Sequence, residues 1–100
     1  MIIIKNNLIP GEMPLEYVIT GHAGYAEHGK DIVCSAVSSL HHSFIRWMNE
    51  RGIQFSCNDD GNILAVSVGD EIARNCFEMV ITGFEGISDA YGDYVKIVYT

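Results

Sequence analysis

Residues 21–40, GHAGYAEHGKDIVCSAVSSL, contain the point at which the chain changes from a strand pattern to a helix pattern. The preceding residues 15–20 alternate imperfectly between two faces, with the period of two that a strand requires. From residue 31 the apolar side chains recur every three or four positions, which is the period of a helix. The sequence therefore predicts a strand, a loop with three glycines and a helix in succession.

The predicted helix begins after Asp31 and ends at Gly52. Aspartate is favoured as an N-cap because its carboxylate accepts hydrogen bonds from the first backbone N–H groups of a helix. Glycine is favoured just beyond a helix because it adopts positive φ angles easily. The apolar side chains between them form one stripe, so we expect this helix to be well buried. The stripe consists of Val33, Val37, Leu40, Phe44 and Met48.

Extended patterns flank this helix on both sides. Residues 1–5 are rich in β-branched side chains and predict a short first strand. Residues 53–57 and 63–68 are separated by the turn sequence NDDGN, which predicts a hairpin. Residues 94–99 are β-branched and aromatic and predict a final strand.

A second helix is predicted between the hairpin and the final strand, with its start at residues 69–71. Its expected apolar face is formed by Ile72, Cys76, Val80, Phe84 and Ile87. The element order is then ββαββαβ. The predicted fold class is α/β (α+β), a single small domain over residues 1–100 in which two helices pack on a mixed β-sheet.

Composition and charge exclude several classes of function. The chain has 100 residues, of which 48% are hydrophobic, enough for one core. Thirteen acidic and six basic residues give a net charge of -7, so direct nucleic-acid binding is not expected and a basic partner is favoured. The apolar run at residues 1–4 is too short for a signal peptide or membrane span. We therefore expect a cytoplasmic protein that does not bind membranes.

The three cysteines, Cys34, Cys57 and Cys76, are too few to all pair within one chain and are not closely spaced. They are interpreted as reduced thiols. Cys57 and Cys76 are expected to be small core residues, since most cysteines in apolar segments are. Cys34 differs because it lies where the glycine loop meets the start of the helix.

Cys34 falls at the third helical position if Asp31 is the N-cap. Unpaired N–H groups and the helix dipole favour a thiolate there by about 0.3–1 kcal/mol, which is insufficient for efficient attack at neutral pH. A histidine is the usual second activator of such a thiol. His22 is well placed for this role because it follows the strand that leads into the loop. We therefore predict a catalytic pair of His22 as general base and Cys34 as nucleophile.

Supporting roles are predicted for Gly21, which allows the chain to bend beside His22, for Asp31, which caps the helix, and for Ser38, one turn beyond Cys34. The loop itself is predicted to act as a mobile lid over the site. The lid residues are Ala23, Gly24, Tyr25 and Gly29.

Two other interpretations remain open at this point. His22, His28, Cys34 and His41 are all residue types that bind zinc, although their spacing matches no compact metal motif. A lone cysteine or histidine can also be a structural or solvated residue. We interpret His28, His41 and His42 in this way. A domain with no catalytic role, which only holds a partner, is the second alternative.

The central motif resembles the signature of the ribosomal-processing cysteine protease family, Prp. Ser35 and His28 depart from the family pattern, and neither removes a group that the chemistry requires. The residues that carry the resemblance are Gly21, His22, Ala23, Gly29, Lys30, Asp31, Ile32, Val33, Cys34, Ala36, Val37 and Ser38.

This resemblance implies a cytoplasmic endopeptidase that removes the short N-terminal extension of large ribosomal subunit protein twenty-seven during ribosome assembly. Family substrates are cut after an aromatic pair and before a small residue. The resemblance further implies a His22–Cys34 dyad, a homodimer, a loop that substrate orders, and no metal or organic cofactor. A non-catalytic, ribosome-associated binding module of the same fold is the alternative.

Overall fold

The alternating residues Leu15–Thr20 form β2, the middle strand of a sheet with the order β3-β4-β2-β1-β5. The structure is a computed structural model that describes residues 1–7, 13–27 and 30–100. Strand β1 pairs in parallel with β5, and the other neighbours are antiparallel, so the sheet is mixed as predicted. The strands are β1 (Ile2–Asn6), β2 (Leu15–Thr20), β3 (Ser56–Asp59), β4 (Ile63–Val68) and β5 (Val95–Tyr99).

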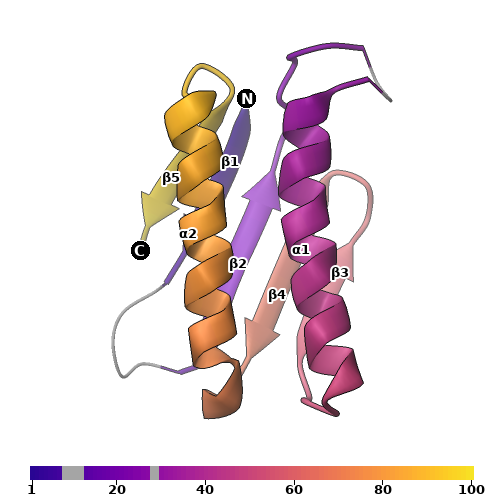
Figure 1. The fold of residues 1–100 in the computed structure, drawn as a ribbon, viewed down its shortest axis with the longest axis vertical. Helices are drawn as coiled ribbons and strands as arrows, with labels where there is room; N and C mark the ends of the chain where they lie inside the picture. Colours follow the sequence, from indigo (N-terminus) through magenta and orange to yellow (C-terminus); the bar gives the residue numbers. More distant parts are fainter. Residues whose placement is uncertain (8–12, 28–29) are drawn as a thin grey trace.

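Both long helices lie on the same face of this sheet and pack against each other (Figure 1). They are α1 (Ile32–Glu50) and α2 (Arg74–Ala90), and α2 is preceded by a short 3-10 turn, η1 (Glu71–Ala73). The ββαββαβ order and the α+β architecture are therefore confirmed. Among the described residues, neither helix has the length and apolar character needed to cross a lipid bilayer.

The core lies between the sheet and the two helices. The inward side chains of β2 are Leu15, Tyr17 and Ile19, which are buried as their alternation predicts. Both helices cover these side chains with continuous apolar faces. The buried helical side chains are Val33, Val37, His41, Phe44 and Met48 from α1, and Phe77, Val80, Ile81 and Phe84 from α2.

The predicted face of the second helix is wrong at its start. Ile72 is 69% exposed and Cys76 is only half-buried, whereas Ala73 and Phe77 are fully buried. The chain begins this helix with the 3-10 turn, capped by the Asp70 side chain, which accepts a hydrogen bond from the Ile72 N–H. The buried positions Ala73, Phe77 and Val80 follow the helical period of 3.6 residues, whereas the predicted steps of four residues drift around the helix, so Ile72 and Cys76 lie beside the buried face.

The predicted strand at residues 53–57 is also shifted, since β3 covers Ser56–Asp59. Ile53 is buried in the segment that follows α1, and this burial explains why it resembled a strand residue. Strand β3 is at the edge of the sheet and all its residues are exposed, including Cys57, which was expected in the core. All three cysteines are free.

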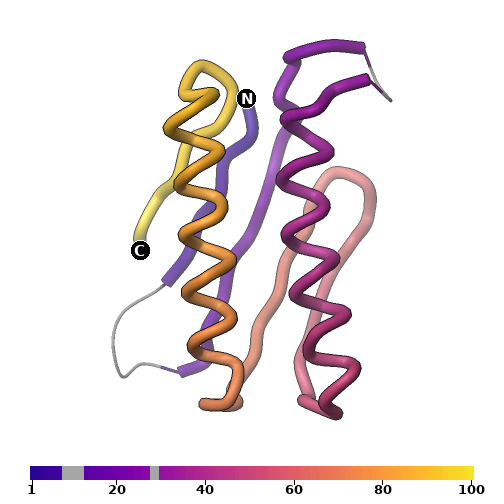
Figure 2. Tube along the Cα trace, viewed as in Figure 1, coloured from indigo at the N-terminus to yellow at the C-terminus, as the bar shows by residue number. Residues whose placement is uncertain are grey.

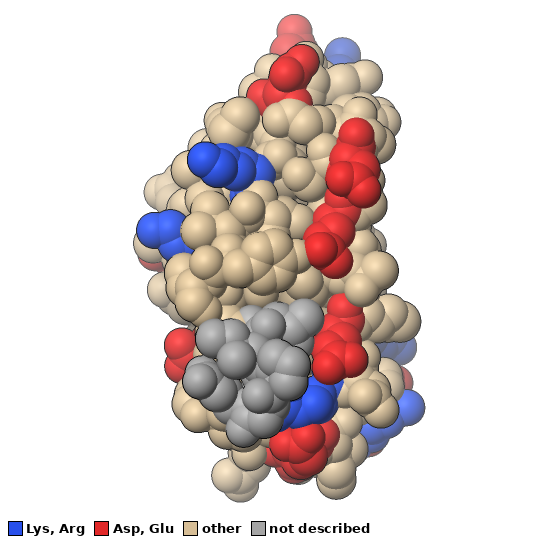
Figure 3. Space-filling view, turned by 90° about the vertical axis from the view of Figure 1, so that its left-hand side faces the viewer, with Lys and Arg blue, Asp and Glu red and all other residues tan. Residues whose placement is uncertain are grey.

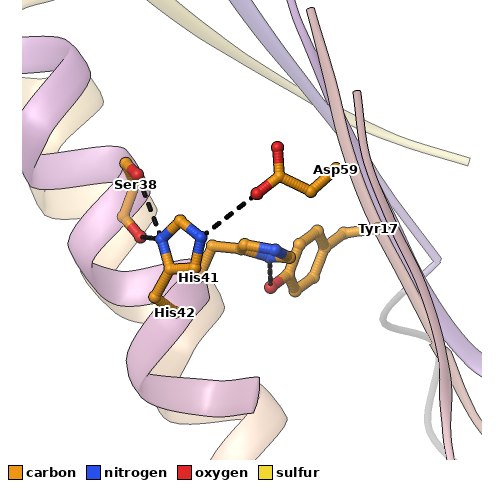
Figure 4. Close-up of polar contacts among 5 residues, drawn as sticks. All are labelled: Tyr17, Ser38, His41, His42 and Asp59. Carbon is orange, nitrogen blue, oxygen red and sulfur yellow. Dashed lines mark hydrogen bonds and ion pairs between the residues drawn. The ribbon is translucent and has the colours of Figure 1, made fainter. Parts of the chain in front are cut away.

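One buried position of α1 is polar. His41 is 2% exposed and occupies the position on the buried stripe that was expected for Leu40. Its Nδ1 atom lies 2.6 Å from the Tyr17 hydroxyl oxygen (Figure 4). Burial raises the pKa of Tyr17, so the hydroxyl keeps its proton and donates it to Nδ1. Burial, together with the neighbouring His42, lowers the pKa of His41 to about 4, so this imidazole is neutral.

This buried pair predicts a pH dependence of stability. In the unfolded chain His41 takes up a proton near pH 6.5, whereas the folded protein holds it neutral down to about pH 4. The free energy of unfolding should be fully retained above pH 6.5 and should fall by about 1–3 kcal/mol as the pH drops towards 4. Urea denaturation at several pH values measures this. His41→Gln keeps an acceptor for Tyr17 and should flatten the dependence; an unchanged slope in this variant would contradict the assignment.

Candidate active site

The site begins at the end of β2, where the chain turns at Gly21. This glycine has a φ of +84°, and a Cβ atom at this position would lie 2.3 Å from the backbone oxygen of Met1. A larger residue is therefore excluded by both the backbone angle and the contact with the N-terminal strand. His22 follows directly and its side chain is exposed. Gly21 thus determines where His22 leaves the sheet.

The Asp31 carboxylate connects the loop after β2 to the start of α1. Its Oδ1 accepts hydrogen bonds from the N–H groups of Val33 and Cys34, both at 3.0 Å. Its Oδ2 accepts from the N–H groups of Tyr25 at 3.0 Å and Ala26 at 3.4 Å. These bonds, led by the one from Cys34, hold the pKa of Asp31 below its usual value although the side chain is buried. The predicted N-cap is confirmed.

Cys34 is the third residue of α1, as the sequence predicted. The backbone N–H of Ala23 points at its Sγ, at a distance of 3.4 Å. A backbone donor and the N-terminal end of a helix both stabilise negative charge on sulfur. The thiol is half-buried, so it remains accessible from one side. The environment of Cys34 is therefore suited to a thiolate.

A groove with a volume of about 950 Å³ opens over this thiol. Its walls are the N-terminal half of α1 and the end of the β3–β4 hairpin. Figure 2 shows the loop after β2 arching over the end of the molecule at which α1 begins. Six of the predicted site residues line the groove: Gly21, His22, Gly24, Asp31, Cys34 and Ser38.

His22 and Cys34 face this common groove, but no hydrogen bond joins them in the described part of the chain. The Nε2 atom of His22 instead lies 3.4 Å from the Oδ1 atom of Asn62, in the β3–β4 turn. An imidazole held by a long hydrogen bond at an exposed position can reorient when a substrate enters. The structure therefore brings the two residues to one site without joining them.

Tyr25 is turned away from the groove. Its ring makes edge contacts with Tyr91 at 5.5 Å and Tyr94 at 5.2 Å between ring centroids. Aromatic contacts of this kind contribute about 0.5–1.5 kcal/mol each. Ala23 is buried, and Gly29 lies outside the described residues. The described part of the predicted lid is thus fixed at Asp31 and at the two tyrosines.

The described residues among the four possible zinc ligands do not all come together. His41 is buried in the core against Tyr17 and does not line the groove with His22 and Cys34. His28 lies outside the described residues. Within residues 1–7, 13–27 and 30–100, no three histidine, cysteine or acidic side chains are grouped closely enough to hold a metal ion.

The groove residues that the sequence did not assign to the site include three with functional side chains: His42, Asp59 and Asn62. Asp59 and Asn62 belong to the hairpin, which the pairing of β4 with β2 brings beside α1. In the sequence these two residues indicate only a turn, because no local pattern shows which distant segment a turn will lie beside. His42 follows Cys34 and Ser38 at steps of four residues. This helical spacing could have placed His42 on the same face of the helix as Cys34.

Comparison with known proteins finds relatives that match most of the chain. The family model described as cysteine protease Prp matches residues 1–96. The ribosomal processing cysteine protease Prp of Mycoplasma genitalium is 29% identical over 82 residues, which are 80% of this chain and 83% of that protein.

Two solved structures of the essential ribosomal processing protease Prp from S. aureus are similar over 100% of both chains. The complex with a covalently linked product peptide has a TM-score of 0.89 at 20% identity. The complex with a substrate peptide has a TM-score of 0.84 at 18% identity. At these identities the likeness shows that the fold is shared.

The close approach at Gly21 predicts a measurable cost of substitution. Gly21→Ala places a methyl group against the Met1 backbone and should lower the free energy of unfolding by about 2–4 kcal/mol. Gly24→Ala is the matched control, since Gly24 also has a positive φ but nothing lies within 4 Å of its added Cβ. It should cost about 1 kcal/mol. Equal losses in urea denaturation would show that the contact with Met1 is unimportant.

Proposed function

The chain belongs to the cysteine protease Prp family, and we propose that it is an endopeptidase in which Cys34 is the nucleophile and His22 the general base. The observation that carries this proposal is the environment of Cys34. Its sulfur lies at the start of α1, accepts the Ala23 N–H at 3.4 Å, and opens on a groove that His22 also lines. No cofactor enters this reaction.

The proposed reaction has two stages. The Cys34 thiolate attacks the carbonyl carbon of the scissile bond, and the imidazolium of His22 donates its proton to the leaving amine. The C–N bond breaks and a thioester remains on Cys34. A water molecule then gives a proton to His22 and attacks the thioester, which releases the new carboxylate and regenerates the thiolate. Asp31 acts by positioning, since it fixes the helix start that presents the sulfur.

The oxyanion formed in each stage needs a nearby donor. The N–H groups of Val33 and Cys34 are already bound by the Asp31 carboxylate. The Ala23 N–H points at the reacting sulfur, so it is close to the position where the carbonyl oxygen would develop charge. We therefore assign Ala23 N–H as an oxyanion donor.

We further propose that the substrate is the N-terminal extension of large ribosomal subunit protein twenty-seven, cut after an aromatic pair, and that the enzyme is a cytoplasmic homodimer. This follows from the family resemblance. The net charge of -7 supports capture of a basic ribosomal protein. Figure 3, which faces the α2–β5 side, shows acidic side chains following one another down the molecule. The α2 acidic residues Glu78, Glu85 and Asp89 are exposed.

Substrate cleavage tests the dyad directly. Wild-type protein should cut a peptide after an aromatic pair that precedes Ala and Ser, and product masses identify the bond. Cys34→Ala and His22→Ala should each lower kcat/KM by about a thousandfold or more, because each removes a reacting group. Circular dichroism should be unchanged, since losing one half-exposed side chain destabilises only modestly. Processing by folded Cys34→Ala, or no cleavage of peptide and intact protein by wild type, would favour a non-catalytic binding module.

The proposed lid over the site must release its present contacts if it moves. Residues 23–27 are held by Asp31 and by the packing of Tyr25 on Tyr91 and Tyr94. Binding of a peptide to Cys34→Ala should change hydrogen exchange in residues 23–27 by about threefold or more, and exchange in the α2 core should stay constant as a control. Tyr25→Ser should raise exchange in the free protein. Identical exchange with and without peptide would rule out a lid.

A further inference from the structure

A second polar cluster lines the same groove beyond Cys34, and the proposed reaction does not use it. It consists of Ser38 and His42 on α1 and Asp59 at the end of β3 (Figure 4). The Nδ1 atom of His42 lies 2.9 Å from the backbone oxygen of Ser38 and 3.1 Å from its Oγ. The Nε2 atom lies 3.3 Å from Oδ2 of Asp59. The cluster thus connects the two walls of the groove.

The hydrogen positions in this cluster follow from its acceptors. The backbone oxygen of Ser38 can only accept, so the Nδ1 atom of His42 carries a hydrogen. In a neutral ring the Nε2 atom then carries a lone pair, and it faces a carboxylate oxygen, which is also an acceptor. Two facing acceptors need a hydrogen between or beside them. It comes either from a second proton on the ring or from an outside donor that reaches both Nε2 of His42 and Oδ2 of Asp59. The side chains of His42 and Asp59 are 56% and 51% exposed, so such a donor has access.

The charges that line the groove favour a cation as that donor. Asp31 and Asp59 are the two carboxylates of the described lining, which contains no lysine or arginine. Asp31 is already used, because both its oxygens accept backbone N–H groups. Asp59 has His42 as its partner among the described side chains. It is therefore the groove carboxylate that can accept a hydrogen bond from a ligand.

The spacing along α1 places this cluster within reach of a bound peptide. Cys34, Ser38 and His42 follow at steps of four on one helical face, and all three line the groove. Eight residues of helix rise by about 12 Å. An extended peptide covers that distance in about four residues, at roughly 3.3 Å each. A peptide cleaved at Cys34 and lying along the groove would thus present a side chain to the cluster.

We propose that His42 and Asp59 form a subsite that binds a lysine or arginine side chain of the peptide substrate, about three to four residues from the scissile bond. The cationic group donates one N–H to the Nε2 atom of His42 and another to the Oδ2 atom of Asp59. Ser38 holds the imidazole in the required orientation. This inference rests on the proposed peptide cleavage at Cys34, and it names the class of residue that the groove selects.

The test compares peptides that differ only in one side chain. All peptides carry an aromatic pair followed by Ala and Ser. In the first series Lys or Gln is the third or fourth residue before the cleaved bond, and in the second series it is the third or fourth residue after that bond. In one series, wild-type protein should prefer Lys over Gln by about three- to tenfold in kcat/KM. Asp59→Asn should bring that ratio close to one. Asp93→Asn, an equal charge change at an exposed position outside the groove, should keep it.

Binding separates failure of the subsite from failure of the protease proposal. The same peptides, labelled, are titrated by fluorescence polarisation into Cys34→Ser protein and into its combination with Asp59→Asn. A preference for Lys that Asp59→Asn abolishes supports the subsite even if wild-type protein cleaves nothing. Cleavage with equal rates for Lys and Gln in every position overturns it. So does a preference for Lys that is equal in Asp59→Asn and Asp93→Asn. If Asp59→Asn does not fold, His42→Leu removes the Nε2 acceptor and should abolish the preference instead.

Discussion

The structure of the site depends on the buried carboxylate of Asp31. Four backbone N–H groups donate to its two oxygens, two from the first turn of α1 and two from the loop after β2. A carboxylate at such a buried position is stable only when its oxygens are satisfied, so the loop and the helix are held in one relative position. That position brings the Ala23 N–H to the Cys34 sulfur. One side chain therefore accounts for the helix start, the loop path and the surroundings of the thiol.

Helix α1 serves the core and the groove with two different faces. Val33, Val37, His41, Phe44 and Met48 point into the core, and Cys34, Ser38 and His42 line the groove. Because successive residues are about 100° apart around a helix, the second set lies beside the first on the cylinder. Packing of the apolar stripe on β2 consequently fixes the direction of the groove. The buried Tyr17–His41 hydrogen bond adds a polar constraint to that packing.

Much of this architecture could be predicted because its signals are local. The alternation of Leu15–Thr20, the capping of Asp31 and the turn residues before Ile63 each act within a few positions, and the structure confirms all three. The errors occur where a local signal was overridden. Ile72 lies one position before the buried face that begins at Ala73, and the edge position of β3 exposed Cys57. The polar stripe position of His41 was unexpected because its partner, Tyr17, is distant in sequence.

The sequence by itself determined the order of elements, the start of α1 and the place of Cys34 within it, because periodicity and capping are properties of neighbouring residues. It also predicted His22 as the partner of Cys34, since His22 stands at the end of the strand that leads into the loop. Only the tertiary structure decided what surrounds them. Pairing of β4 with β2 brings Asp59 and Asn62 from the hairpin to the groove. The approach of Met1 to Gly21 likewise depends on the pairing of β1 with β2. Such contacts join segments far apart in the chain, and no local pattern encodes them.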